Sequence, residues 1–277
     1  MNVLQESWQG FLSFTLESHF GKTVVKDKKH FGPLVLQRPY YQELNRPTIL
    51  VIHPPGGVVA GDQLTMEVSL KENAQAFIST PAATKFYRSL GARSYQTQRL
   101  KLAHHSQLEW LPQETLFFNQ ANVHNRLYFE LESAEAELIA WDIVGFGRPA
   151  MQESFSQGEV LQKVEISLAG KPVFIDQFYF NDDSEIFVSP FGLNRATLMA
   201  TMMFYHSDIS HLRSLKKELL AEDWVVNCGV TLVNNVLLLR TLDTDLDNLK
   251  ARLISAWKLA RPLIISVPAV MPRIWNT

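Results

Sequence analysis

The chain has 277 residues, of which 46% are hydrophobic, and its 26 basic and 28 acidic residues give a formal net charge of −2. This balance counts against a nucleic-acid-binding protein, which usually carries a basic surplus. A single cysteine, Cys228, excludes a disulfide within the chain and is typical of a reducing cytoplasm.

No apolar run approaches the roughly 20 residues that a membrane-spanning helix needs. The N-terminal sequence MNVLQESWQGFLSF has no basic region ahead of an apolar stretch, so no signal peptide is predicted. We therefore expect a cytoplasmic protein that binds neither nucleic acid nor membrane.

The first distinctive element is the glycine-rich turn that begins at Pro54. A phosphate-binding loop needs a Lys-Ser/Thr pair directly after its last glycine and then a helix. Here Gly61 is followed by Asp62, which would repel phosphate, and by a predicted strand. The sequence therefore predicts no nucleotide binding, and we interpret Pro54-Pro55-Gly56-Gly57 as a tight turn with positive φ at a glycine.

The next two thirds of the chain are predicted to form short strands. Polar and apolar residues alternate in Leu64–Leu70, Leu127–Leu131 and Val164–Leu168. Strand–turn–strand units recur at about 30-residue intervals, over residues 68–78, 100–111, 129–141 and 166–175. Such a repeat favours stacked β-layers, as in a β-helix, over the alternative of an ordinary β-sandwich.

The C-terminal third has a different pattern. Residues 208–223 and 245–261 carry apolar side chains at helical spacing, with Asp208 or Ser207 placed to cap the first helix and Pro262 following the second. Between them, Asn234-Asn235 joins two apolar runs as a hairpin turn. We predict one mainly β domain over residues 1–277, with two α-helices near its C-terminus.

Candidate catalytic groups are sparse. In a strand, Lys85, Tyr87 and Ser89 would share one face, but no nucleophile with an orienting base lies near them in the sequence. A non-catalytic protein is therefore favoured. The alternative is a β-fold hydrolase or lyase that uses Lys85, Tyr87 and Glu109.

Metal-ligating residues are also scattered. His206 and His211 are five residues apart and would diverge on a helix, and His104-His105 lies in a predicted turn. No tight metal site and no tightly bound cofactor are predicted. Among the carboxylates, Glu109 interrupts an apolar strand, where it would need a partner, a water or a cation.

Several motifs occur together in a fixed order. They are Gly32–Pro39, His53–Gly57, Gly61-Asp62, Thr80–Ser89, Leu108–Glu114, Gly147–Pro149 and Pro272–Trp275. In this combination the chain resembles the urease accessory protein UreD family, called UreH in some organisms. The segment from about Phe180 to His206 departs most from the family pattern, so nothing is carried over there.

The resemblance implies a non-catalytic role and a mostly β, stacked fold with two helices. Members of the family bind apo-urease together with UreF and the GTPase UreG, and the assembly delivers nickel to the dinickel centre of urease. We therefore expect apo-urease and UreF as direct partners, UreG through UreF, and a transient nickel ion as cargo.

Two sets of site residues follow as predictions. Arg273 and Trp275 in the C-terminal tail are expected to bind a partner or clamp the tail onto the core. Asp62, Glu109, Glu114 and Asp142 are expected to line a hydrated route for nickel, since carboxylates bind this ion weakly enough to release it. The competing interpretation is that these carboxylates cap turns or pair with Lys85, Arg88 and Arg148. Oligomeric state, nickel affinity and the faces that contact each partner are left open.

Overall fold

The computed structural model describes residues 7–89, 91–181 and 185–276, and this part of the chain is mainly β with two α-helices. The strands are β1 Gln9–His19, β2 Lys22–Phe31, β3 Val35–Leu36, β4 Thr48–Ile52, β5 Gln63–Leu70, β6 Gln75–Ser79, β7 Thr84–Phe86, β8 Ser94–Leu102, β9 Gln107–Trp110, β10 Thr115–Phe117, β11 Asn122–Leu131, β12 Glu137–Phe146, β13 Glu159–Leu168, β14 Lys171–Phe180, β15 Leu198–Tyr205, β16 Cys228–Val233 and β17 Val236–Asp243. The α-helices are α1 Ile209–Leu220 and α2 Leu246–Ile264, and short 3-10 helices cover Pro149–Met151, Glu185–Phe187, Asp223–Asn227 and Arg273–Asn276.

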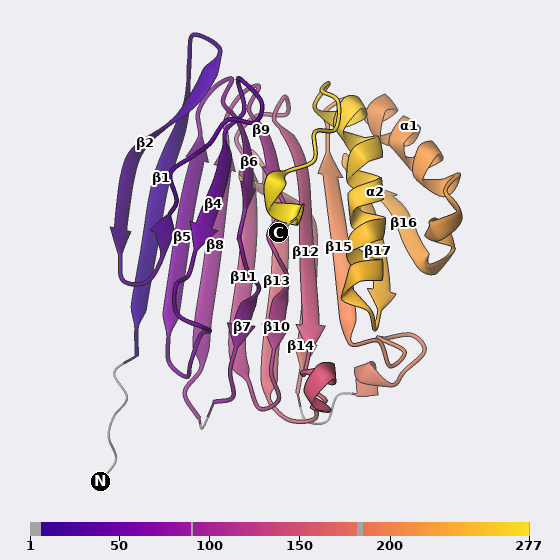
Figure 1. Cartoon of the computed structure of the whole chain (residues 1–277). Coiled ribbons are helices and arrows are strands. Elements are labelled where there is room, and N and C mark those ends of the chain that lie inside the picture. The colour runs from indigo at the N-terminus through magenta and orange to yellow at the C-terminus, as the bar shows by residue number, and fades with distance from the viewer. Residues whose placement is uncertain (1–6, 90, 182–184, 277) are drawn as a thin grey trace.

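The strands form two large sheets that face each other across the core (Figure 1). One sheet has the order β14-β13-β11-β8-β5-β1-β2, and the other runs β16-β17-β15-β12-β9-β6-β4-β3. The chain passes from the first sheet to the second at β5–β6, β8–β9 and β11–β12, and each strand pairs in parallel with its counterpart in the next unit. This is the predicted stack of β-layers, so the predicted fold class is confirmed.

The register of the parallel strands is set by rows of apolar side chains. Val68, Leu100, Phe129 and Ile166 stand at matching positions on β5, β8, β11 and β13, and each is at most 1% exposed. A slip of one residue would turn every such row out to solvent. Burying each side chain contributes about 1.5–3 kcal/mol, so the alternation visible in the sequence fixes the stacking.

The fourth predicted repeat is not a layer. Instead of crossing to the other sheet, β13 turns back into β14, its antiparallel neighbour in the same sheet. The two residues between them, Ala169 and Gly170, both have positive φ, +47° and +77°. Two-residue turns of this kind match the twist of a hairpin, which is why this unit folds back on itself.

The C-terminal elements agree with the prediction except at one helix end. The Asp208 side chain accepts the Ser210 N–H at 2.8 Å and caps α1. Asn234 lies in the predicted hairpin turn between β16 and β17 with φ +51°. Helix α2 was expected to end before Pro262 but continues to Ile264. Ile264 and Arg261 are fully buried, and this packing holds the last turn in spite of the proline.

Both helices cover the outer face of the larger sheet, where a second apolar core lies (Figure 1). Every residue of β15 is buried, because this strand lies between that layer and the inter-sheet core. The strand forms the C-terminal part of the segment, about Phe180 to His206, for which the sequence offered no interpretation. In the described part of the chain, neither helix has the length and apolar character needed to cross a membrane.

Candidate functional site

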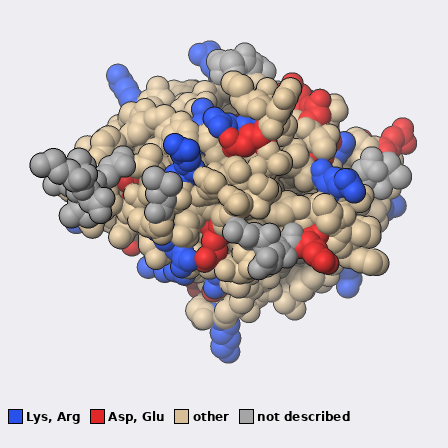
Figure 2. Space-filling model, turned by 90° about the horizontal axis from the view of Figure 1, so that it is seen from below, with Lys and Arg blue, Asp and Glu red and all other residues tan. Residues whose placement is uncertain are grey.

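Three of the motifs singled out in the sequence, His53–Gly57, Thr80–Ser89 and Gly147–Pro149, lie at one end of the stack, the lower end in Figure 1, whereas the C-terminal motif lies nearer its middle. At the lower end the turn after β4 pairs with β7, since the Val58 N–H donates to Lys85 O at 2.7 Å and the Tyr87 N–H donates to Val58 O at 3.0 Å. The loop after β10 lies against the same turn, with the ring of Phe118 5.2 Å from that of Tyr87 and the Arg148 guanidinium over Phe118. Viewed from this end, charged side chains are scattered over a largely uncharged surface (Figure 2).

The glycine pair in the first turn serves close packing. Positive φ, +87°, occurs at Gly61 and not at Gly56 or Gly57, so the expectation for Pro54–Gly57 was wrong. A Cβ on Gly57 would lie 2.4 Å from Tyr87 Cε2 and 2.7 Å from Lys85 O. Gly57 therefore lets the turn lie directly on β7.

Asp62 organises the next turn. Its Oδ1 accepts the Trp8 N–H at 2.8 Å and its Oδ2 accepts the Val59 N–H at 3.0 Å. The residue is 3% exposed. Both oxygens are thus engaged with backbone, as the turn-capping interpretation expects.

Two of the three residues of the alternative enzyme hypothesis, Tyr87 and Glu109, have separate partners. Strand β7 ends at Phe86, so Lys85, Tyr87 and Ser89 do not form the shared strand face that the sequence suggested. The Tyr87 hydroxyl donates to Gly56 O at 3.2 Å. Glu109 bonds instead to helix α2, and the structure shows no contact between it and Lys85 or Tyr87.

Glu109 is fully buried and is the centre of an ionic network on the helix side of the larger sheet. Its carboxylate accepts Trp257 Nε1 at 2.6 Å and is bound by two nitrogens of Arg261 at 3.0 and 2.9 Å. Arg46 Nη1 lies 3.5 Å from the same carboxylate, and Glu43 pairs with Arg261 at 2.7 Å. Burial lowers the pKa of Arg46, and the charge of Glu109 opposes that shift. The network ties α2 and the segment before β4 to β9.

Glu114 and Asp142 lie in two further places. Glu114 Oε2 forms an ion pair with Lys250 Nζ of α2 at 2.7 Å. Asp142 lies on β12 and accepts Gln162 Nε2 of the opposite sheet at 2.6 Å. The four predicted carboxylates thus do not share one space. In residues 7–89, 91–181 and 185–276, no three His, Cys, Asp or Glu side chains are grouped so as to hold a metal.

The histidines differ from expectation in one respect. The rings of His206 and His211 stack with centroids 4.2 Å apart and 8° between their planes. They meet because α1 begins at Ile209, so His206 precedes the helix and is free to turn back onto it. His206 lies 3.8 Å from Glu137, and His211 Nδ1 contacts Leu263 O at 2.5 Å.

A polar band crosses the inter-sheet core, and the sequence analysis missed it. Gln96, Asn125 and Gln162 stand at the same register on β8, β11 and β13, and all three are buried. Gln96 Nε2 donates to Asn125 Oδ1 at 3.2 Å, and Gln162 reaches Asp142. The signal was a polar residue at an inward position of three successive strands, but it shows only once the strand register is known.

The band continues to the far strands of both sheets. Asp142 stands opposite Thr201 of β15, whose Oγ1 accepts Arg240 Nε at 3.1 Å, and Arg240 in turn pairs with Asp176 of β14. The pKa of Asp142 is raised to about 6, chiefly by burial; the Gln162 hydrogen bond opposes this shift and the charge of Asp176 adds to it. Asp142 is therefore a carboxylate that titrates near neutral pH inside the protein.

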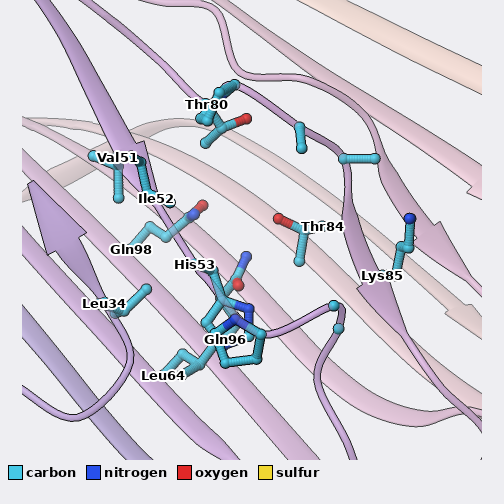
Figure 3. Close-up of a pocket in the computed structure, with 16 residues that line it drawn as sticks. Leu34, Val51, Ile52, His53, Leu64, Thr80, Thr84, Lys85, Gln96 and Gln98 are labelled. Atoms are coloured by element: carbon cyan, nitrogen blue, oxygen red, sulfur yellow. The ribbon is translucent and has the colours of Figure 1, made fainter. Parts of the chain in front are cut away.

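At its other end the band meets a cavity of about 80 Å³ beside the motif turns (Figure 3). Gln96 lines this cavity together with His53, Thr84 and Gln98. Burial lowers the pKa of His53, and the nearby charge of Asp62 opposes that shift. The polar band and the cavity together connect the motif-bearing end with the middle of the core.

The C-terminal tail is docked on the core. Trp275 stacks on Trp141 with ring centroids 5.1 Å apart, and its edge contacts to Phe77 and Trp257 have centroids 5.7 and 5.0 Å apart. Arg273 is exposed. The clamp that the sequence analysis considered is therefore present at Trp275, and partner binding at these two residues stays a prediction. Residue 277 lies outside the described part of the chain.

Comparison with known proteins gives a consistent result over nearly the whole chain. A family model described as UreD urease accessory protein matches residues 9–276. A urease accessory protein UreD from Alcanivorax borkumensis is 34% identical over 276 residues, which cover 98% of this chain and 93% of that protein. Proteins of the same name from Pseudomonas putida and Citrobacter koseri are each 35% identical, and their matches cover 98% and 99% of this chain and 95% and 94% of those proteins.

Proposed function

The chain belongs to the UreD urease accessory protein family, and from this membership we propose that it is a scaffold that binds apo-urease together with UreF and, through UreF, the GTPase UreG. A role in urease maturation follows from the family itself. The motif-bearing end supports a scaffold, since its conspicuous side chains bond to neighbouring turns and leave a largely uncharged outer surface (Figure 2). We further propose that the protein acts in the cytoplasm and has no catalytic activity of its own.

We propose that nickel, as cargo, passes along the polar band between the sheets. The observation that carries this proposal is the continuous row from Gln96 to Asp142 and on to Asp176, in a core that is otherwise apolar. Amide and carboxylate oxygens bind Ni²⁺ more weakly than thiolates and imidazoles do, and weak sites suit transit. With its pKa near 6, Asp142 is ionised at pH 7 and above and can attract a cation.

This proposal narrows the set of route residues. Asp142 keeps its predicted role. Asp62 bonds to backbone N–H groups, Glu109 to arginines and Glu114 to a lysine. We therefore propose that these three residues support the fold around the route and do not line it. The cations they meet are Arg46, Arg261 and Lys250, not those that the competing interpretation named.

The test replaces Asp142 by Asn, which keeps the shape of the side chain and removes its charge. The control is Glu130→Gln on the outer, solvent-facing side of β11. Both variants are co-expressed with UreF, UreG and apo-urease, and the accessory complex and the nickel content of purified urease are measured. We expect an intact complex and at least tenfold less nickel for Asp142→Asn only. Full nickel loading with the complex intact would rule out the route, and loss of the complex would assign Asp142 a structural role.

A second test asks whether the C-terminal tail takes part in binding UreF. We propose that removal of residues 273–277 weakens UreF binding at least tenfold, which corresponds to about 1.4 kcal/mol. Because Trp275 also packs on the core, the exposed Arg273→Ala change separates the two effects. Unchanged UreF affinity in a folded truncated protein would exclude the tail from the interface.

The hydrolase or lyase alternative using Lys85, Tyr87 and Glu109 has its own test. Turnover by the isolated chain, lost on Lys85→Met or Tyr87→Phe, would favour it over the scaffold. We expect no turnover, and no hydrolysis of GTP or ATP once contaminating UreG is removed.

A further inference from the structure

The cavity beside the motif turns has an unusual lining. It lies between the turn after β4 and the inward faces of β5 and β8, and its polar side chains are His53, Thr80, Thr84, Lys85, Gln96 and Gln98. Figure 3 shows His53 and Gln96 close together at one end, the Thr84 hydroxyl directed toward the middle, and Lys85 extending away along the rim. About 80 Å³ is several times the roughly 10–15 Å³ that one water requires, so the space suits a molecule of a few heavy atoms.

Several hydrogen-bonding groups around this cavity have no protein partner. His53 Nε2 is buried and accepts or donates no hydrogen bond within the described residues. In that same part of the chain the Thr84 hydroxyl and the Gln98 amide make no side-chain hydrogen bond, whereas the Thr80 hydroxyl accepts the Gln113 N–H at 2.9 Å. Buried polar groups are nearly always satisfied, so the unpaired His53 Nε2 beside this space indicates a ligand or ordered water. The half-buried Thr84 hydroxyl and Gln98 amide are available to bind the same molecule.

The charges of the lining decide between ligand classes. No carboxylate lines the cavity, and Lys85 is its one ammonium group. Burial lowers the pKa of His53, so its imidazole is neutral at pH 7 and offers one N–H. Asp62 acts on His53 from outside the lining, with both oxygens bonded to backbone N–H groups. A cation would find no charged ligand here, whereas an anion finds N–H and O–H donors and a nearby ammonium group.

We propose that this cavity binds a small planar oxyanion, a carboxylate or carbonate of about four heavy atoms. The Thr84 hydroxyl, the Gln98 amide and the His53 ring N–H donate to its oxygens. The second N–H of Gln96, whose first N–H bonds to Asn125, completes the donor set. Lys85 adds positive charge at the rim, and Gly57 keeps the turn close enough to close the cavity.

The experiment uses the full chain and follows the His53 ring by nitrogen–proton NMR. Sodium formate and sodium bicarbonate are titrated at constant ionic strength against sodium chloride. We expect saturable shifts of the His53 ring signals with formate, bicarbonate or both, and none with chloride. Tighter binding of formate would indicate that the cavity prefers a carboxylate, and tighter binding of bicarbonate would indicate a carbonate.

Two chemically identical substitutions give a matched comparison. Thr84→Val removes the hydroxyl from the cavity, and Thr97→Val makes the same change on β8, between Gln96 and Gln98 but on the outer face of the sheet. We expect Thr84→Val to weaken oxyanion affinity at least tenfold and Thr97→Val to change it less than twofold. Gln98→Met is the second cavity variant, and circular dichroism verifies the fold of each.

Shifts that do not saturate, shifts that chloride reproduces, or unchanged affinity in both cavity variants would overturn the proposal and leave a water-filled cavity. The measurement needs neither nickel nor UreF. Its failure therefore leaves the proposed role in urease maturation untouched, and the failure of the Asp142→Asn test leaves the oxyanion site untouched.

Discussion

Replacing Glu109 by alanine is expected to destabilise the whole fold. The substitution removes three hydrogen bonds of 2.6–3.0 Å and leaves the fully buried guanidinium of Arg261 with one carboxylate, Glu43, and one backbone carbonyl, Pro268 O. Arg46 would lose its ion-pair partner at the same time. Removing one partner of a buried ion pair costs about 3–5 kcal/mol, because the remaining charge is left uncompensated in the interior.

The cost can be measured by urea unfolding, followed by circular dichroism. We expect the free energy of unfolding to fall by about 4 kcal/mol, and the melting temperature by roughly 7 °C for a chain of this length. Glu130→Ala is the matched control. Its carboxylate pairs with Arg99 and Lys101 on the solvent-facing side of the smaller sheet, where such pairs contribute less than about 1 kcal/mol.

A loss below about 1 kcal/mol for Glu109→Ala would refute the assignment of Glu109 as the compensating charge of this network. The same experiment guides the nickel tests. If Glu109→Ala lowers urease activation together with stability, the loss says nothing about a metal route.

Three other changes have defined outcomes. Trp275→Ala should lower the free energy of unfolding by about 2 kcal/mol through lost aromatic packing, and Arg273→Ala, at an exposed position, should leave it unchanged within error in the same urea titration. The Asp142 pKa, about 6 in the folded protein against 3.8 ordinarily, gives a stability contribution that is full below about pH 4 and lost as the pH rises through 6. Asp142→Asn should remove this dependence and stabilise the protein by about 3 kcal/mol at pH 7, and a pH-independent difference would contradict it. Gly57→Ala should cost about 1–3 kcal/mol through the clash with Tyr87 and Lys85 O, whereas Gly56→Ala, with its nearest atom at 3.6 Å, should be close to neutral by thermal melting.

The layout of the fold was predictable where local pattern determines structure. Alternation in Leu64–Leu70 and its counterparts gave the strands, and their 30-residue spacing gave the stack. The fourth unit was misassigned as a layer. It forms a hairpin because its two turn residues, Ala169 and Gly170, both have positive φ. Of these two residues only Gly170 signals that conformation in the sequence, and alanine gives no such signal.

The candidate site was less predictable because its contacts are non-local. The sequence showed that Glu109 would need a partner, but Arg46 and Arg261 lie 63 and 152 residues away from it in the chain. The polar band of Gln96, Asn125 and Gln162 exists only through the register of neighbouring strands, which no local pattern supplies. Similarly, His206 and His211 meet because the helix begins three residues after His206.

The parallel stack ends on antiparallel strands, and this fixes how long the molecule can be. In the smaller sheet β2 and β14 flank the parallel strands β1, β5, β8, β11 and β13, and in the larger sheet β3 and β15 flank β4, β6, β9 and β12. A further layer, from the same chain or a second copy, would have to pair with one of these end strands, and the exposed lysines of β2 disfavour edge pairing there. The number of layers is therefore set by the two ends, so duplication or loss of an inner layer would change the length of the body while both ends kept their structure.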